Sequence, residues 1–157
     1  MNYAYPIGIS YSFNRHYGGN ADVGFIETYS DIMLYDIVDS SAVSLYSSYV
    51  TSFNQGAVVD LKGSATSGIS GGFILSSSFS GSVDGILFTD LVSASYESAQ
   101  GDSGGIVFIP SNVTNHAYPA GIHKGSYSQD SNQYSAFTKL YNGIAALQSG
   151  TITYSLY

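Results

Sequence analysis

The sequence contains no cysteine and no tryptophan, and only 10% of its residues are charged. The absence of cysteine excludes a disulfide framework, a thiolate zinc site and a cysteine nucleophile. Four residues are positive and eleven are acidic, a formal net charge of −7. No basic stripe exists that would favour binding to nucleic acid or to an anionic membrane. No apolar run approaches the roughly 18 residues that a membrane-spanning helix requires.

Targeting and metal-binding signals are also scarce. The amino end lacks the basic residues and the apolar run of a signal peptide, which fits a cytosolic protein, a mature chain or a truncated one. His116 and His123 are seven positions apart and have no carboxylate cluster near them in the sequence. We therefore predict no metal site and no cofactor.

What is present favours a single all-β domain. Serine, 18 glycines and 15 tyrosines dominate the 157 residues, a composition typical of short strands joined by tight turns. One stretch, 140–148, has apolar residues at helical spacing. Residues 31–35 fit either a short strand or an irregular loop. The predicted strands are 7–13, 23–28, 56–62, 69–77, 86–95, 105–109, 120–123 and 134–140, separated by turns such as 80–82 and 126–132.

One segment, Gln100-Gly101-Asp102-Ser103-Gly104-Gly105, has the composition of a nucleophile-bearing turn. Small neighbours allow a tight turn that exposes the Ser103 hydroxyl, and Gly101 leaves room for a substrate carbonyl. The amides of Gly101 and Ser103 are candidates for an oxyanion hole. The same residues match the G-x-S-x-G elbow of α/β-hydrolases, but that motif requires a following helix and then an acid before the histidine. Neither follows Ser103, so the elbow interpretation is rejected.

The segment resembles the nucleophile region of trypsin- and chymotrypsin-like serine proteases, with all six residues matching. Further stretches match in the expected order: Asp22-Val23-Gly24-Phe25-Ile26, Gly121-Ile122-His123-Lys124-Gly125 and Ala136-Phe137-Thr138-Lys139-Leu140. They are similar to the strand that follows the triad aspartate, to the wall of the specificity pocket, and to the closing strand before the terminal helix. The resemblance implies a double β-barrel and a serine endopeptidase with catalytic Ser103 and Asp22.

The resemblance also implies a catalytic histidine before Asp22, because the family order is His, Asp, Ser. Only 21 residues precede Asp22, and His16 is six positions upstream, too close to span the intervening strands. We therefore expect residues 1–40 to correspond to the end of the first barrel and residues 41–157 to a complete second barrel with its helix. The chain is then a fragment, a product truncated at its start, or half of a split protease. It is expected to be inactive alone or to self-associate through unpaired strand edges.

The resemblance suggests two alternatives for specificity. Glu97, six residues before Ser103, corresponds to the acidic pocket base of trypsin-like enzymes and would favour Lys or Arg in the substrate. His123, followed by Gly125, corresponds to the pocket histidine of glutamyl endopeptidases and would favour acidic residues. We favour His123, because its position on a strand fixes its direction.

Two functions remain in competition at this point. The first is a secreted serine endopeptidase, with peptide or protein substrates and with localisation implied by the resemblance alone. The second is a non-catalytic protein with the same fold that recognises a peptide or glycan through its tyrosine-rich surface. For Asp102, we expect burial, and a buried carboxylate then requires hydrogen-bond donors from within the chain.

Overall fold

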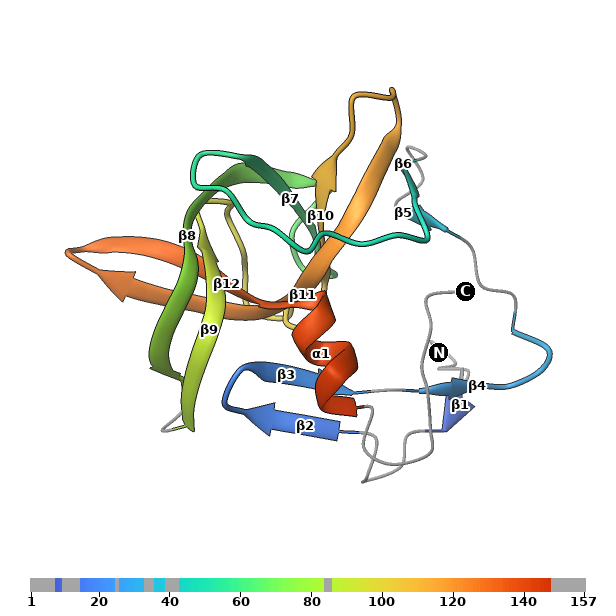
Figure 1. Cartoon of the computed structure of the whole chain (residues 1–157), viewed down its shortest axis with the longest axis horizontal. Helices are drawn as coiled ribbons and strands as arrows, with labels where there is room; N and C mark the ends of the chain where they lie inside the picture. The colour runs from blue at the N-terminus through green and yellow to red at the C-terminus, as the bar shows by residue number, and fades with distance from the viewer. Residues whose placement is uncertain are drawn as a thin grey trace, which may run out of the picture.

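The computed structural model describes residues 8–9, 15–24, 26–32, 36–38, 43–83 and 86–147. Within these residues the chain is composed mainly of strands, with one helix at the end (Figure 1), which confirms the predicted all-β class. The first strands are short: β1 (Gly8–Ile9), β2 (Arg15–Gly18), β3 (Ala21–Gly24), β4 (Glu27–Thr28), β5 (Ile37–Val38) and β6 (Val43–Leu45). The later elements are β7 (Val58–Lys62), β8 (Ser70–Val83), β9 (Ile86–Ala94), β10 (Ile106–Pro110), β11 (His116–Gln129), β12 (Asn132–Lys139) and α1 (Leu140–Leu147).

The strands from β7 to β12 form a closed barrel. They are hydrogen-bonded in the order β10-β7-β8-β9-β12-β11, and a further pairing of β10 with β11 closes the ring. All of these pairings are antiparallel. Closure removes the free edges that an open sheet of this size would present. β6 then adds to β11 in parallel, and β5 pairs with β6.

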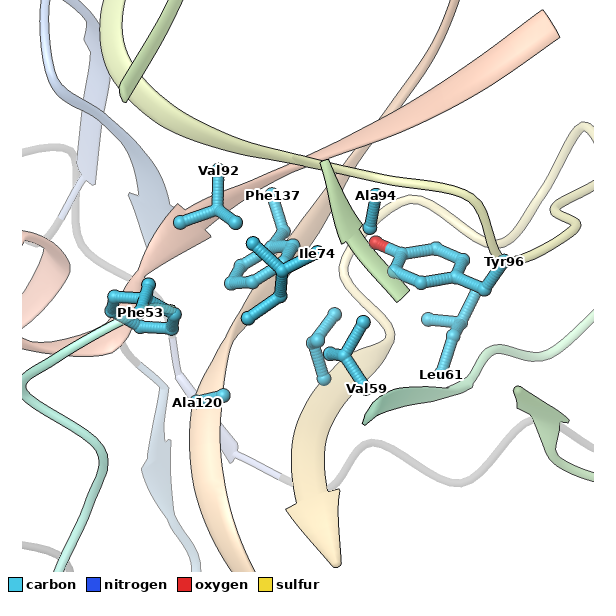
Figure 2. Close-up of a cluster of buried hydrophobic side chains, with 10 residues drawn as sticks. Phe53, Val59, Leu61, Ile74, Val92, Ala94, Tyr96, Ala120 and Phe137 are labelled. Atoms are coloured by element: carbon cyan, nitrogen blue, oxygen red, sulfur yellow. The ribbon is translucent and has the colours of Figure 1, made fainter. Parts of the chain in front are cut away.

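The barrel interior is apolar and contains the largest core cluster of the described residues (Figure 2). Its members come from every strand of the barrel and from the segments just before β7 and just after β9: Phe53, Val59, Leu61, Ile74, Val92, Ala94, Tyr96, Val107, Ala120 and Phe137. All are less than 9% exposed. Alternating inward-facing positions on six strands therefore bury one continuous core, which holds the loops at the barrel ends in place.

Helix α1 lies between the barrel and the β2–β3 hairpin (Figure 1) and contacts both. The approach to β3 is close at Gly143, where a Cβ atom would lie 2.7 Å from Cγ1 of Val23. The turn of the hairpin is also fixed to the barrel, because Gly19 donates to the Leu87 carbonyl (3.1 Å) and Thr89 donates to the Gly19 carbonyl (2.6 Å). These contacts set the position of β3, and therefore of Asp22, relative to the barrel.

Several predicted boundaries were wrong. The stretch 23–28 is not one strand, because β3 ends at Gly24 and β4 starts at Glu27. Strands β8 and β11 continue through the turns predicted at 80–82 and near 126. In both cases glycine and serine, which sequence reasoning takes as turn residues, are tolerated because partner strands supply the ladder hydrogen bonds. Asp31 and Ile32 belong to no strand, and residues 7, 10–13, 25 and 33–35 of the predictions lie outside the described residues.

The hairpin between β11 and β12 has a two-residue turn at Asp130 and Ser131, both with positive φ (50° and 64°). Such a turn matches the right-handed twist of the paired strands, and Gln129 faces Asn132 directly across it.

The predicted helix 140–148 corresponds to α1. No helix in the described part of the chain is long and apolar enough to cross a membrane.

Candidate active site

The segment predicted to carry the nucleophile, which we call the nucleophile segment, connects β9 to β10 and turns tightly at Ser103. Gly101 and Gly104 have φ values of 107° and 86°, which favour glycine over residues with a Cβ atom. The Gly104 amide donates to the His123 carbonyl (2.9 Å), and the His123 amide donates to the Gly105 carbonyl (2.8 Å). Strand β11 thereby holds the turn, and the Ser103 side chain is exposed at its tip. The predicted exposure of Ser103 on a tight turn agrees with the structure.

The Asp102 side chain is fully buried beneath the turn. Its carboxylate accepts hydrogen bonds from the amides of Ala65 (2.7 Å), Thr66 (2.9 Å) and Ala99 (2.8 Å), and from the Thr66 hydroxyl. Burial alone would raise the pKa of Asp102, but the hydrogen bonds from Ala99, Thr66 and Ala65 outweigh it and hold the pKa well below the ordinary value. The donors that a buried Asp102 was expected to require are therefore supplied by the loop between β7 and β8.

Two amides of the turn remain available. Within the described part of the chain, the amides of Asp102, Gly104 and Gly105 have backbone acceptors, whereas those of Gly101 and Ser103 have none. These are the two amides predicted to form an oxyanion hole. Unpaired donors beside an exposed hydroxyl can stabilise negative charge on a substrate oxygen.

Asp22 lies on β3 and lines a cavity together with residues of the Ser103 turn. The cavity measures about 320 Å³ and is lined by Asp22, Val23, Gly24, Ser103, Gly104, Ile122 and His123. The Asp22 amide donates to the Thr138 hydroxyl (3.0 Å), which anchors β3 to the barrel. The structure therefore brings Asp22 and Ser103, predicted from separate motifs, to one cavity.

Lys124 contacts both of these residues, and the sequence reasoning did not find it. Its Nζ lies 3.0 Å from Oδ2 of Asp22, and its backbone carbonyl accepts a hydrogen bond from the Ser103 hydroxyl (3.1 Å). The ammonium also lies over the rings of Tyr17 (4.9 Å) and Phe88 (5.2 Å). Burial would lower the pKa of Lys124, but the hydrogen bond and charge of Asp22 raise it overall, so the side chain stays charged. Its position beside His123 carried no signal in the sequence.

Neither histidine with a described side chain bridges Asp22 and Ser103. The His116 Nδ1 lies 3.0 Å from the Thr114 carbonyl oxygen, and its ring packs on Tyr46. The His123 Nδ1 lies 3.0 Å from the Tyr96 hydroxyl. The backbone of His16 pairs with Val23 in the β2–β3 hairpin, and its side chain lies outside the described residues.

His123 and Gly125 line a second cavity beside Ser103. This cavity measures about 350 Å³, and its other lining residues are Ser98, Ala99, Gln100, Gly101, Ser103, Ser126 and Gln133. His123 is only 3% exposed. Burial lowers the pKa of its imidazole to about 4, with the charge of Asp102 opposing the effect and that of Lys124 adding to it. The ring is therefore neutral at neutral pH.

The two residues considered for specificity lie in different places. Glu97 is exposed and lines a neighbouring cavity of about 370 Å³, together with Ser95, Tyr96, Ser98, Gln133, Tyr134 and Ser135. It does not line either cavity that contains Ser103. The geometry thus separates Glu97 from Ser103, whereas His123 and Gly125 line a cavity with it. Among the described residues, no group of three or more His, Cys, Asp or Glu side chains could hold a metal ion.

No family model matches the sequence, and no curated protein matches it. Solved structures do match the fold. A glutamic-acid-specific serine protease, described as using a histidine triad in substrate binding, superposes with a TM-score of 0.69 at 19% identity, over 89% of this chain and 71% of its own. Cellulomonas bogoriensis chymotrypsin superposes with a TM-score of 0.65 at 21% identity, over 86% and 71%.

Thermobifida fusca protease A gives a TM-score of 0.64 at 19% identity, over 80% of this chain and 65% of its own. Each similarity covers the larger part of this chain, and all point to one architecture. The chain therefore has the fold of chymotrypsin-like bacterial serine proteases, which are double β-barrels, and its described residues contain one closed barrel and the short strands before it.

Proposed function

We propose that the protein is a serine endopeptidase in which Ser103 is the nucleophile and Asp22 orients the base. The observation that carries the proposal is the cavity shared by Asp22 and Ser103, next to the amides of Gly101 and Ser103, which have no acceptor within the described part of the chain. The fold similarity to serine proteases supports it. By the same resemblance, we propose that the protein acts outside the cell.

The proposed reaction proceeds through an acyl-enzyme. Ser103 Oγ attacks the substrate carbonyl carbon while its proton passes to a base. The carbonyl oxygen becomes negative and accepts hydrogen bonds from the Gly101 and Ser103 amides. The base then protonates the leaving amine, and water hydrolyses the ester formed on Ser103 by the reverse route.

We propose that the base is an imidazole held between Asp22 and Ser103, as in the related proteases. The buried position of His123 and the remote position of His116 argue against both for this role. The ion pair with Lys124, 3.0 Å from Nζ to Oδ2, holds the Asp22 carboxylate in place on the wall of the cavity. We also propose that residues 1–40 correspond to the end of the first barrel and residues 41–157 to the second.

For specificity, we propose that the cavity beside Ser103 receives an acidic side chain through His123. An entering carboxylate would favour the protonated imidazole and offset the burial that now lowers its pKa. The exposed Glu97 in its separate cavity argues against a preference for Lys or Arg. The similarity to a glutamic-acid-specific protease supports the same direction.

The test is labelling with a fluorophosphonate, which forms an Oγ–P bond and expels fluoride. The chain, Ser103→Ala and His16→Ala are each treated with and without added imidazole, and the modified residue is identified by mass spectrometry. We expect a label on Ser103 with imidazole present and none in Ser103→Ala. A label that needs no imidazole and disappears in His16→Ala would assign the base to His16. No label on Ser103 under any condition would contradict the proposal.

A second candidate is a non-catalytic protein that binds a peptide or glycan. Several tyrosines are exposed, including Tyr17 (50%) and Tyr118 (37%), and Tyr118 packs on Tyr46 with ring centroids 4.5 Å apart. Aromatic surfaces of this kind suit peptide and sugar recognition. Binding of a peptide or glycan array that is unchanged in Ser103→Ala, without any labelling, would favour this candidate.

A further inference from the structure

The loop between β7 and β8 packs against the nucleophile segment. We call its residues 63–66 (Gly63, Ser64, Ala65 and Thr66) the clasp segment. Ala65 and Thr66 supply three of the four hydrogen bonds to the buried Asp102 carboxylate, two from amides and one from the Thr66 hydroxyl. No donor to Asp102 among the described residues is a charged group. Neutral groups of one loop thus fix the residue next to the nucleophile.

The clasp segment also contacts the nucleophile segment directly. The Ser64 hydroxyl donates to the Gly101 carbonyl (2.8 Å). A Cβ atom on Gly63 would lie 2.2 Å from Oδ1 of Asp102, and one on Gly105 would lie 2.9 Å from Cα of Gly63. The two segments therefore pack without space for a side chain between them.

The clasp segment and Ala99 together hold the peptide group between Gly101 and Asp102, whose N–H donates to the Ala99 carbonyl (3.1 Å). Ser64 fixes its carbonyl, and the carboxylate that follows is fixed by Ala65 and Thr66. The amides of Gly101 and Ser103 flank this peptide group and have no acceptor of their own among the described residues. Among the described residues, the contacts that can direct these two amides are therefore those made by their neighbours, to the clasp segment and to Ala99.

We propose that the clasp segment positions the oxyanion-binding amides, with Thr66 as a positioning residue that acts through Asp102 and Ser64 as one that acts through Gly101. The inference rests on the proposed role of Ser103. Thr66 is half-buried and its hydroxyl donates to the Asp102 carboxylate. A valine at this position keeps the methyl group and removes the hydroxyl. On this proposal, the β7–β8 loop must be folded for the amides of Gly101 and Ser103 to be in position.

The experiment compares Thr66→Val, which loses the hydroxyl, with Thr66→Ser, which keeps it. Thr114→Val is the matched control, because Thr114 is exposed on the loop between β10 and β11. Fluorophosphonate labelling of Ser103 with imidazole present is measured over a range of probe concentrations, which separates the limiting rate from probe binding. A misplacement of up to 1 Å lowers the rate by a factor on the order of 10 to 100.

We expect Thr66→Val to lower the limiting labelling rate by at least about tenfold without changing probe binding. Thr66→Ser and Thr114→Val should stay within about threefold of the unsubstituted chain, a split that loss of stability alone would not produce. Backbone NMR gives a readout that needs no activity: the amide resonances of Gly101 and Ser103 should shift in Thr66→Val and not in Thr66→Ser.

The outcomes separate this inference from the proposed function. If the unsubstituted chain is not labelled, the proposed function fails, and the amide resonances alone decide the inference. The inference is overturned if Thr66→Val leaves the amide resonances of Gly101 and Ser103 unchanged. It is also overturned if Thr66→Val is labelled at the rate of the unsubstituted chain. A parallel fall in Thr66→Ser would also overturn it, because the hydroxyl would then not be the cause.

Discussion

At the scale of single residues, the Asp102 carboxylate makes the stability of the fold depend on pH in the acidic range. Its pKa is held below the ordinary value of 3.8, although burial opposes this, by hydrogen bonds from Ala99, Thr66 and Ala65. The stabilisation is therefore fully present above about pH 4 and is lost as the pH falls through the folded-state pKa. Asp102→Asn should cost about 1–3 kcal/mol at pH 7. Urea unfolding at pH 7 and pH 3 checks this, and an equal loss at both values would contradict it.

The buried His123 imidazole should act in a separate pH range. Burial lowers its pKa to about 4 from the ordinary 6.5. Between pH 4 and pH 6.5 the ring is therefore protonated more in the unfolded chain than in the folded one. Stability from the neutral ring is present above about pH 6.5 and is lost as the pH falls towards 4. An NMR titration of the His123 ring should give a midpoint near 4. A midpoint near 6.5 would show that the ring is solvated and not held in the core beside Tyr96.

At the scale of secondary-structure elements, the β11–β12 turn contains a backbone conformation that lowers the stability of the fold. Ser131 has a φ of 64°, a conformation that is unfavourable for residues with a Cβ atom. Ser131→Gly should raise the melting temperature by about 1–4 °C, the shift that corresponds to about 0.5–1 kcal/mol in a chain of this length. Ser128→Gly, in the extended part of β11, is the control and should lower it. Calorimetry that ranks the two variants in the reverse order would contradict the turn geometry.

Sequence reasoning predicted the elements better than their boundaries. The barrel strands, the terminal helix and the Ser103 turn follow from local signals: alternating apolar residues, helical spacing and glycines around one serine. The length of β8 and the division of 23–28 into β3 and β4 depend on partner strands, which no local pattern contains. Likewise, the contacts of Lys124 and Tyr96 join residues far apart in the sequence, so no motif could indicate them.

At the scale of the whole molecule, the barrel leaves apolar side chains on its surface. Val58 and Phe73 face each other across β7 and β8 and are 47% and 54% exposed. An exposed apolar pair on adjacent strands favours association between copies of the chain. Phe73→Ser should therefore shift the chain towards monomer in sedimentation velocity, with Val113→Ser, on an exposed loop, as the control. An unsubstituted chain that sediments as a monomer at all concentrations would contradict the expected association.

The proposed function makes one central claim, that Ser103 carries the acyl group of a peptide substrate, and it rests on the cavity that Asp22 and Ser103 both line. The most direct measurement is intact mass after mixing with a p-nitrophenyl ester of a blocked glutamate, with imidazole present. The ester transfers its acyl group to Oγ and releases p-nitrophenol. We predict one acyl group per chain, located on Ser103 and absent in Ser103→Ala. No acylation of the unsubstituted chain, or equal acylation of Ser103→Ala, would contradict the account.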